Sequence, residues 1–497
     1  MKTLTGTLVL VAAVFGPALS EASAQETPST IGNGSSASVL PPGLVKKSSL
    51  PRQVDFTLEL ANLFVIRNDG DFDRSDPTYG KYGQPEGFLA TFLHPYLGVR
   101  LAEQLRFFYE TEIGMDLWSE KNPDVWLGLE DSRGLSIKQR EIWGELTLNN
   151  WYVKAGFQRM LDSTGLFVNH WIGAVRAGYG LPGESRIVAS FGQFPDQTHE
   201  GWTWGQTFGD FRTDVLLSAL DGTWVFGEML ALDCGAYYVR DGSRVDMLRQ
   251  VGAAAMALRA RGGAWDASLG VVTQFGRGER SAEGGAAGAG AGGADAGSAG
   301  GTTGGQVDPP PYDASDAGIF GWAAEARASG RFSIVTLKGG LAAMSADDAF
   351  EGNDALGFLW SGKRGSRSLL LSENETRDIG DNVDEKMGTF DGWFYEMRTG
   401  LMSADLGLYV DPLKWLTVGA VTEVMAAVNP DNALGNRFAG WESELLVDLH
   451  LLEGAFQVQL VGGMLVPGGA ASAYVNAIDV DATDTMFFGQ TAVLMYF

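Results

Sequence analysis

Cysteine is almost absent from this chain of 497 residues, which contains Cys234 alone. A single thiol cannot form an internal disulfide or a thiolate metal site. Histidine is scarce too, with four residues, and neither an HExxH pair nor a GxSxG elbow occurs. We therefore expect no catalytic residue, no metal ligand and no cofactor. A Ser or Asp brought beside a His in space would escape this argument, but no pattern indicates one.

Positive charge is also in short supply. Lysine and arginine total 36 against 61 aspartates and glutamates, a net charge of −25. A nucleic-acid-binding protein needs a basic surface to neutralise phosphates, so the composition argues against nucleic acid as a partner. It also argues against charge-driven binding to anionic membrane surfaces.

The third feature that is lacking is a long apolar run after the first residues. The chain opens with MKTLTGTLVLVAAVFGPALSEASAQ, in which a charged start, an apolar middle and Ala-Ser-Ala precede Gln25. This pattern is typical of a secretory signal peptide over 1–24, cleaved after Ala24. No later apolar run approaches the roughly 18 residues of a membrane-spanning helix. The sequence therefore predicts an exported protein whose residues 25–52 form a periplasmic linker.

What the sequence does contain is apolar periodicity of two. In QLRFFYETEIGMDLW, which begins at Gln104, apolar residues alternate with mainly polar ones over fifteen positions. AWDASLGVVTQFG from Ala264 and GWESELLVDLH from Gly440 alternate in the same way. A strand that crosses a membrane at a tilt needs about 9–11 residues with an apolar outer face. These segments fit that requirement.

The same pattern predicts about eighteen strands, within a range of 16 to 18. They are 53–66, 86–101, 104–118, 135–148, 151–159, 171–181, 185–195, 208–220, 228–240, 250–260, 264–276, 317–329, 332–345, 397–410, 414–427, 439–450, 455–466 and 485–497. Connections of two to four residues, such as 149–150 and 330–331, alternate with long ones. Short periplasmic turns and long extracellular loops are typical of an outer-membrane barrel. We therefore expect an all-β, antiparallel transmembrane β-barrel over 53–497 in the outer membrane of a Gram-negative bacterium.

Two long loops and the C-terminus carry further expectations. Residues 277–316 are rich in Gly, Ala and Pro and are expected to form a disordered extracellular loop. Residues 346–394 mix aromatic and charged residues and are expected to form an ordered loop that acts as a lid or plug. The final strand should close the barrel against the first, with Val493, Met495 and Phe497 facing lipid and serving as a barrel-assembly signal.

Charged residues on the polar faces of the strands are the candidates for lining the lumen, the interior of the barrel. They are Arg100, Arg106, Glu110, Glu112, Glu141, Glu145, Lys154, Arg176, Arg186, Arg212, Arg327, Lys338, Glu444 and Asp448. Such residues either form cross-strand ion pairs that brace the wall or line a hydrated path for a charged or hydroxylated solute. The sequence leaves both interpretations open.

The hairpin SIKQREIWGELTLNNWYVKAGFQRM over 136–160 resembles one that recurs in alginate-export barrels, through Glu141, Trp143, Glu145 and Lys154. The segment 440–468 is similar to the same family through Glu444 and Asp448. The resemblance implies an 18-stranded outer-membrane barrel that conducts an acidic exopolysaccharide.

The leading expectation for function is accordingly a passive export porin for a polysaccharide or oligosaccharide. A solute-uptake porin and a non-conducting structural or adhesion barrel are the alternatives. The expected partners are outer-membrane lipid and lipopolysaccharide, the barrel-insertion machinery, and periplasmic export or envelope-complex proteins.

Overall fold

Eighteen antiparallel strands form the wall of the barrel. The computed structural model describes residues 53–67, 86–116, 136–194, 215–242, 247–280, 316–346, 355–360, 388–391, 394–475 and 483–497. The wall strands are β1 (Gln53–Arg67), β2 (Glu86–Ala102), β3 (Leu105–Asp116), β4 (Ser136–Leu148), β5 (Trp151–Leu161), β6 (Asn169–Gly180), β7 (Arg186–Gln193), β8 (Val215–Phe226), β9 (Leu230–Asp241), β10 (Met247–Arg261), β11 (Trp265–Arg280), β12 (Asp316–Phe332), β13 (Val335–Met344), β18 (Leu401–Leu413), β19 (Leu416–Ala426), β20 (Phe438–Leu451), β21 (Phe456–Pro467) and β22 (Met486–Tyr496).

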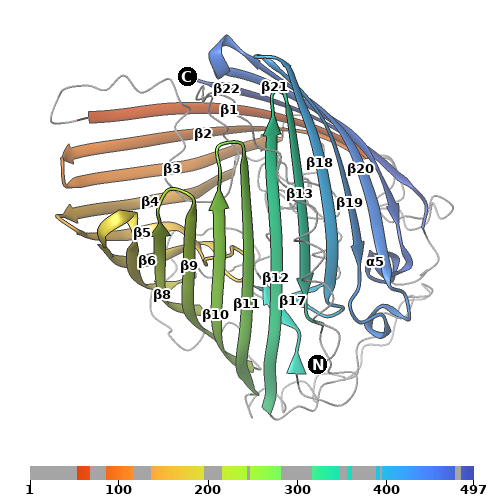
Figure 1. The fold of residues 1–497 in the computed structure, drawn as a ribbon, viewed down its shortest axis with the longest axis horizontal. Helices are drawn as coiled ribbons and strands as arrows, with labels where there is room; N and C mark the ends of the chain where they lie inside the picture. Colours follow the sequence, from red (N-terminus) through yellow and green to blue (C-terminus); the bar gives the residue numbers. More distant parts are fainter. Residues whose placement is uncertain are drawn as a thin grey trace, which may run out of the picture. The chain divides into compact units, whose positions relative to one another are not determined.

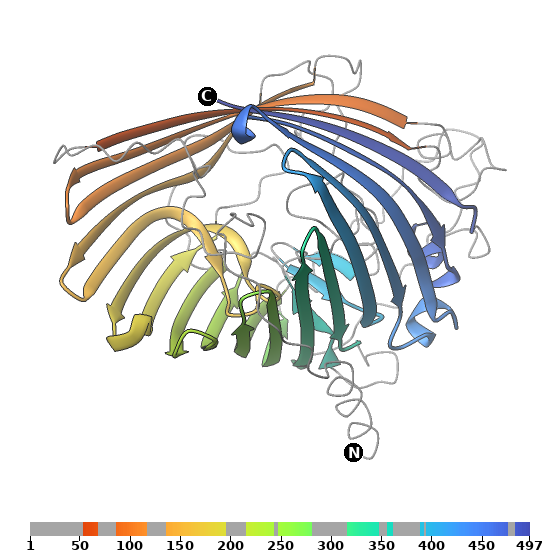
Figure 2. The same cartoon turned by 45° about the horizontal axis from the view of Figure 1, so that its top comes forward.

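The barrel is closed. Each wall strand pairs with its neighbours in chain order, and β1 pairs with both β2 and β22. At the seam, the backbone N–H of Phe497 donates to the carbonyl of Leu58 at 2.9 Å, and the return bond measures 3.1 Å. Closure leaves no open sheet edge between the first and last strands, as the sequence predicted. Figures 1 and 2 show the strands side by side around a ring.

The alternation in the sequence becomes an apolar outside and a mixed inside. On β11 the outward side chains of Trp265, Leu269 and Phe275 are 46%, 50% and 61% exposed, whereas the inward Val272 and Gln274 are fully buried. An exposed apolar outer face is the surface that a membrane-embedded barrel presents to lipid. Among the residues that the structure describes, no helix has the length and apolar character needed to cross a bilayer.

The largest error of the sequence prediction is the position of the eighth strand. We predicted 208–220, but β8 runs from Val215 to Phe226. Asp221-Gly222 looks like a turn signal, yet Asp221 pairs with Gly235 of β9 inside the ladder. Gly222 is needed there because the Trp224 ring lies where its Cβ would be. Residues 208–214 of the predicted strand lie outside the described residues.

Three other boundaries shift by a few residues. β11 continues to Arg280, because Met247–Arg249 of β10 pair with Gly278–Arg280. The long loop predicted from 277 therefore begins four residues too early, and Asp316 at its end already belongs to β12. The turn predicted at 330–331 lies instead after Phe332, where Ser333 adopts a φ of 58°. The rest of the predicted 277–316 loop lies outside the described residues.

The segment between β13 and β18 contributes four short strands. β14 (Ala355–Leu356) pairs in parallel with β12, while β15 (Phe358–Trp360), β16 (Gly388–Asp391) and β17 (Phe394–Met397) form a separate three-stranded sheet, here called the inner sheet. A seven-residue helix, α5 (Gly469–Val475), follows β21. The remainder of the predicted 346–394 loop lies outside the described residues.

Gly156 provides a test of the β4–β5 pairing. Its φ is +131°, and a Cβ at this position would collide with the carbonyl oxygen of Ile142 and lie 2.7 Å from the Cα of Trp143. We expect Gly156→Ala to destabilise the barrel by on the order of 2–3 kcal/mol, because the backbone must move. The measurement is the urea midpoint, read from the folded band on unheated gels. Gly263→Ala is the matched control, since no atom lies within 4 Å of its Cβ position. Equal midpoints for the two variants would contradict the prediction.

Candidate functional site: the lumen and its narrowing

A seven-residue loop, 162–168, is organised by a single carboxylate. The Asp162 side chain accepts hydrogen bonds from the backbone N–H of Thr164 at 2.9 Å, Phe167 at 3.0 Å and Val168 at 2.9 Å, and from the Thr164 hydroxyl. Burial raises the pKa of Asp162, and the bonds that it accepts lower it by less. The loop is thus a preformed unit that depends on one residue.

This loop projects into the lumen. The backbone N–H of Ser163 donates to the hydroxyl of Tyr237 on β9 at 3.0 Å. Thr164 packs on β11, where a Cβ at Gly270 would lie 3.0 Å from its methyl carbon. Leu166, Phe167 and Val168 are at most 1% exposed. The loop joins β5 to β6 but contacts the inner faces of β9 and β11, so it narrows the lumen.

The inner sheet packs against the loop and the wall. The Phe167 ring stacks on Phe394 of β17, with 5.5 Å between centroids and 21° between planes. The Gln274 side chain of β11 donates to the Leu359 carbonyl at 2.6 Å and accepts from the Leu359 N–H at 3.0 Å. An amide side chain thereby takes the place of a strand partner and fastens β15 to the wall. All of Phe358, Leu359 and Trp360 are at most 2% exposed.

One side of the lumen carries cations that form no ion pair within the described residues, although Glu145 of β4 lies opposite Lys154 in register. Lys154 on β5 lies directly opposite Arg176 on β6, and Arg186 follows on β7. Within the described residues, no carboxylate lies within 4 Å of these three side chains or of Arg100 on β2. Like charges directly opposite each other on a sheet destabilise it. We refer to Arg100, Lys154, Arg176 and Arg186 as the basic wall.

An aromatic pair supports one of these cations. The Lys154 ammonium lies 3.8 Å from the centroid of the Trp143 ring, whose Nε1–H donates to Glu141 at 2.6 Å. Phe108 stacks on Trp143 at 5.2 Å. The electron-rich face of an indole attracts a cation. The hairpin singled out from the sequence therefore serves to position Lys154.

Acidic residues occupy the other side of the barrel. Asp405 on β18, Glu423 on β19 and Glu442 on β20 are direct partners in register and form one acidic row. In wall order β6 is the sixth strand and β19 the fifteenth, so the difference of nine is half of eighteen. Lys154, Arg176 and Arg186 thus lie on the opposite side of the barrel from the acidic row, in which Glu423 and Glu442 are at most 1% exposed.

Most of the other candidate residues lie beside neighbours in the wall, and the rest lie outside the described residues. Several are in ion pairs or hydrogen bonds: Arg106 with Glu145 at 3.0 Å, Arg327 with Glu325 at 2.6 Å, and Asp448 with Gln457 and His450. Glu110 lies opposite Glu141, Lys338 lies over the Tyr409 ring, and Glu444 is 3% exposed. Arg212 and the Glu112 side chain lie outside the described part of the chain.

Phe497 is 65% exposed, and Val493 and Met495 share its outward face.

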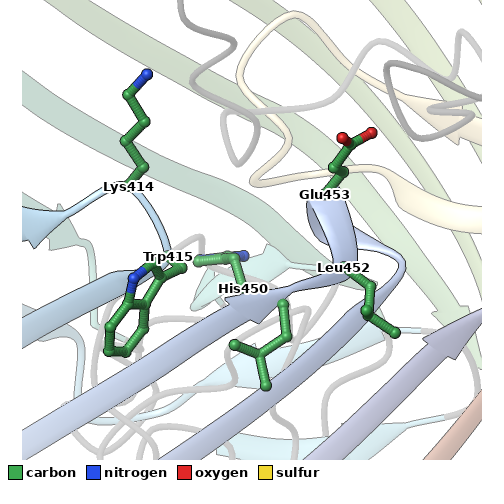
Figure 3. Close-up of a pocket in the computed structure, with 6 residues that line it drawn as sticks. Lys414, Trp415, His450, Leu452 and Glu453 are labelled. Atoms are coloured by element: carbon green, nitrogen blue, oxygen red, sulfur yellow. The ribbon is translucent and has the colours of Figure 1, made fainter.

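A pocket of about 520 Å³ lies at the rim of short turns, away from this narrowing. It is lined by Lys414, Trp415, His450, Leu451, Leu452 and Glu453. Figure 3 shows Lys414 and Glu453 extending to one side of the ribbon and Trp415 and Leu452 to the other. A search of the described side chains finds no group of three His, Cys, Asp or Glu residues suited to hold a metal ion.

Sequence reasoning missed the uncharged part of the site. Ser190 and Tyr237 lie on the inner faces of their strands, and Gln274 fastens the inner sheet. The period-two pattern assigns all three to the polar face, so the signal was present, but only charged residues were chosen from it. Asp221 was missed because it was assigned to a loop.

Known structures share this fold. The structure of OccK9 (OpdG) from Pseudomonas aeruginosa aligns with a TM-score of 0.54 at 13% identity, covering 89% of this chain and 98% of that one. OccAB1 from Acinetobacter baumannii gives 0.52 at 8% identity, covering 89% and 96%. Pseudomonas aeruginosa OccK2 (OpdF) in complex with glucuronate gives 0.50 at 13%, covering 89% and 97%. At these identities the likeness concerns the fold alone, a closed antiparallel β-barrel of 18 strands.

No protein-family model and no curated protein matches the sequence. The structure confirms the strand number and the barrel class that the resemblance to alginate-export barrels implies, and these comparisons do not show the alginate-export family itself. Polysaccharide export is not supported by these comparisons.

Proposed function

We propose that the protein is a passive outer-membrane uptake channel for small anionic solutes. The observation that carries this proposal is the basic wall, which keeps cations facing the lumen without carboxylate partners in the described residues. A wall built only for stability would pair these charges or replace them, because opposed like charges weaken a sheet. Their retention is explained if transient anions neutralise them.

The narrowing favours a small solute over a polymer. The loop 162–168 and the inner sheet occupy the lumen between β5 and β11, and both are held by buried contacts. OccK2, whose fold is shared, was solved with glucuronate, a small carboxylate. These two points support the uptake alternative over export of a polysaccharide.

The test is ion selectivity in a planar bilayer. At roughly 10 Å in water one charge is worth about 0.4 kcal/mol, or about a twofold change in the local concentration of a monovalent ion. We expect the wild-type channel to prefer chloride over potassium, and K154Q/R176Q to lower the chloride-to-potassium preference about sixteenfold, because the two charges together change the local concentration of each ion about fourfold in opposite directions. The measurement is the reversal potential in a KCl gradient.

The control removes a lumen ion pair without changing net charge. Arg331 binds Asp411 at 3.1 Å, so R331Q/D411N should leave the reversal potential unchanged. A cation-selective wild-type pore, or equal shifts in the two double variants, would refute the role of the basic wall. A protein that inserts and carries no current would refute the channel itself.

A further inference from the structure

Several buried polar atoms next to the basic wall have no hydrogen-bond partner in the part of the chain that the structure describes. They are Arg176 Nε, Ser190 Oγ and Asp221 Oδ2, all on the inner faces of β6, β7 and β8. Ser190 is 93% buried, since only 7% of it is exposed. Most buried polar groups in proteins are bonded, so three such atoms in one neighbourhood point to a bound polar molecule.

The strand register places the three side chains together. Arg176 is the direct partner of Ser190, and Ser190 is the direct partner of Ala219. Asp221 is the next inward residue along β8, which makes it the diagonal neighbour of Ser190 at about 7 Å. Ala219 adds little bulk beside Ser190, and the Tyr152 ring lies over Gly178 at the edge of this area. The three groups thus surround one small area of the wall.

The three groups include two hydrogen-bond donors and one acceptor. Arg176 Nε carries a hydrogen and Ser190 can donate one, so both suit an anionic oxygen. Asp221 Oδ2 is an acceptor, and its other oxygen is already occupied by the Tyr237 hydroxyl, which donates to it. Tyr237 in turn accepts from the N–H of Ser163, so the loop 162–168 covers this area.

We infer that Arg176, Ser190 and Asp221 form a two-point recognition site for small carboxylates that carry an adjacent hydrogen-bond donor, a hydroxyl or an ammonium group. Arg176 and Ser190 bind the carboxylate, and Asp221 accepts from the donor. This inference rests on the proposed function and narrows its substrate class. A simple carboxylate leaves Asp221 unsatisfied, so it binds less well.

Lactate and propionate are suitable probes, because they have the same charge and differ by one hydroxyl. The measurement is the uptake of each labelled anion, below saturation, into proteoliposomes that contain the full-length protein. A hydrogen bond to a charged group is worth enough to favour lactate about tenfold. In D221N the oxygen that accepts from Tyr237 is retained but the second oxygen becomes an uncharged amide that can only donate, so the charge-assisted bond from the lactate hydroxyl is lost and the lactate-to-propionate ratio should fall well below the wild-type value.

Asp266→Asn is the matched control. Asp266 also faces the lumen, where it accepts from Ser329, so its variant loses the same charge at another position and should keep the wild-type ratio. Equal uptake of the two anions by the wild type, or an unchanged ratio in D221N, would overturn the two-point site and mean that only water occupies it. Neither outcome touches the proposed function, which in this assay fails if neither anion enters.

Discussion

Replacement of Asp162 by alanine should raise the single-channel conductance several-fold. The change leaves three buried backbone N–H groups without an acceptor, at about 1–3 kcal/mol each. A seven-residue loop held mainly by these bonds cannot absorb that loss, so it should leave the lumen. The measurement is conductance in a planar bilayer at symmetric KCl, with the folded band on unheated gels as the check on the barrel.

The neighbouring residue supplies the control. The Ser163 hydroxyl has no hydrogen-bond partner, and the contact of this residue with Tyr237 is made by its backbone N–H. S163A should therefore keep the wild-type conductance. If D162A and S163A conduct equally while both remain folded, the loop does not narrow the conducting path.

The buried carboxyl group of Asp162 also predicts that the conductance depends on pH. The pKa of Asp162 is raised in the folded loop, so the closed form binds a proton more tightly than the open form does. Protonation of Asp162 therefore stabilises the closed loop. The stabilisation is complete at pH values below the usual pKa of an aspartic acid, and it is lost as the pH rises through the raised pKa of Asp162 in the closed loop. Wild-type conductance should thus fall on acidification across that window. D162A should lose this part of the pH profile.

The barrel could be predicted because the same sequence pattern recurs in many strands. Each wall strand repeats the same alternation, so an error in one strand, such as the placement of the eighth at 208–220, leaves the class and the strand number intact. Short turns between long strands fix the antiparallel order. Register, by contrast, was not predicted, although it decides that Lys154 opposes Arg176.

The narrowing could not be predicted because its contacts are long-range. Asp162 and Phe167 lie in a segment that appears in the sequence as an ordinary loop, and nothing local indicates that Phe167 stacks on Phe394, which is 227 positions away (394 − 167). The pairing of Gln274 with Leu359 is of the same kind. Polar periodicity identifies which side chains face inward, but only the fold shows which of them are left unpaired.

Gln274→Leu should release the inner sheet and give a second large rise in conductance. Leucine fills a similar volume but removes both bonds to Leu359, leaving one buried N–H and one buried C=O unsatisfied at about 1–3 kcal/mol each. The inner sheet has only three short strands, so this wall contact is a large part of what fixes it in the lumen. We expect a larger and noisier current, since the sheet can then adopt several positions.

The control for Gln274→Leu is Thr273→Val on the preceding residue. Thr273 faces outward on β11, so its variant tests the same strand without touching the inner sheet. The hydrogen-exchange rate of the Leu359 amide provides a direct readout: it should rise in Gln274→Leu and stay at the wild-type value in Thr273→Val. Faster exchange without a change in conductance would mean that the inner sheet is fastened by Gln274 but lies beside the conducting path, which then follows the basic wall and the loop 162–168 alone. Unchanged exchange would show that the apolar packing of Phe358 and Trp360 suffices to hold β15, and the role assigned to Gln274 would be wrong.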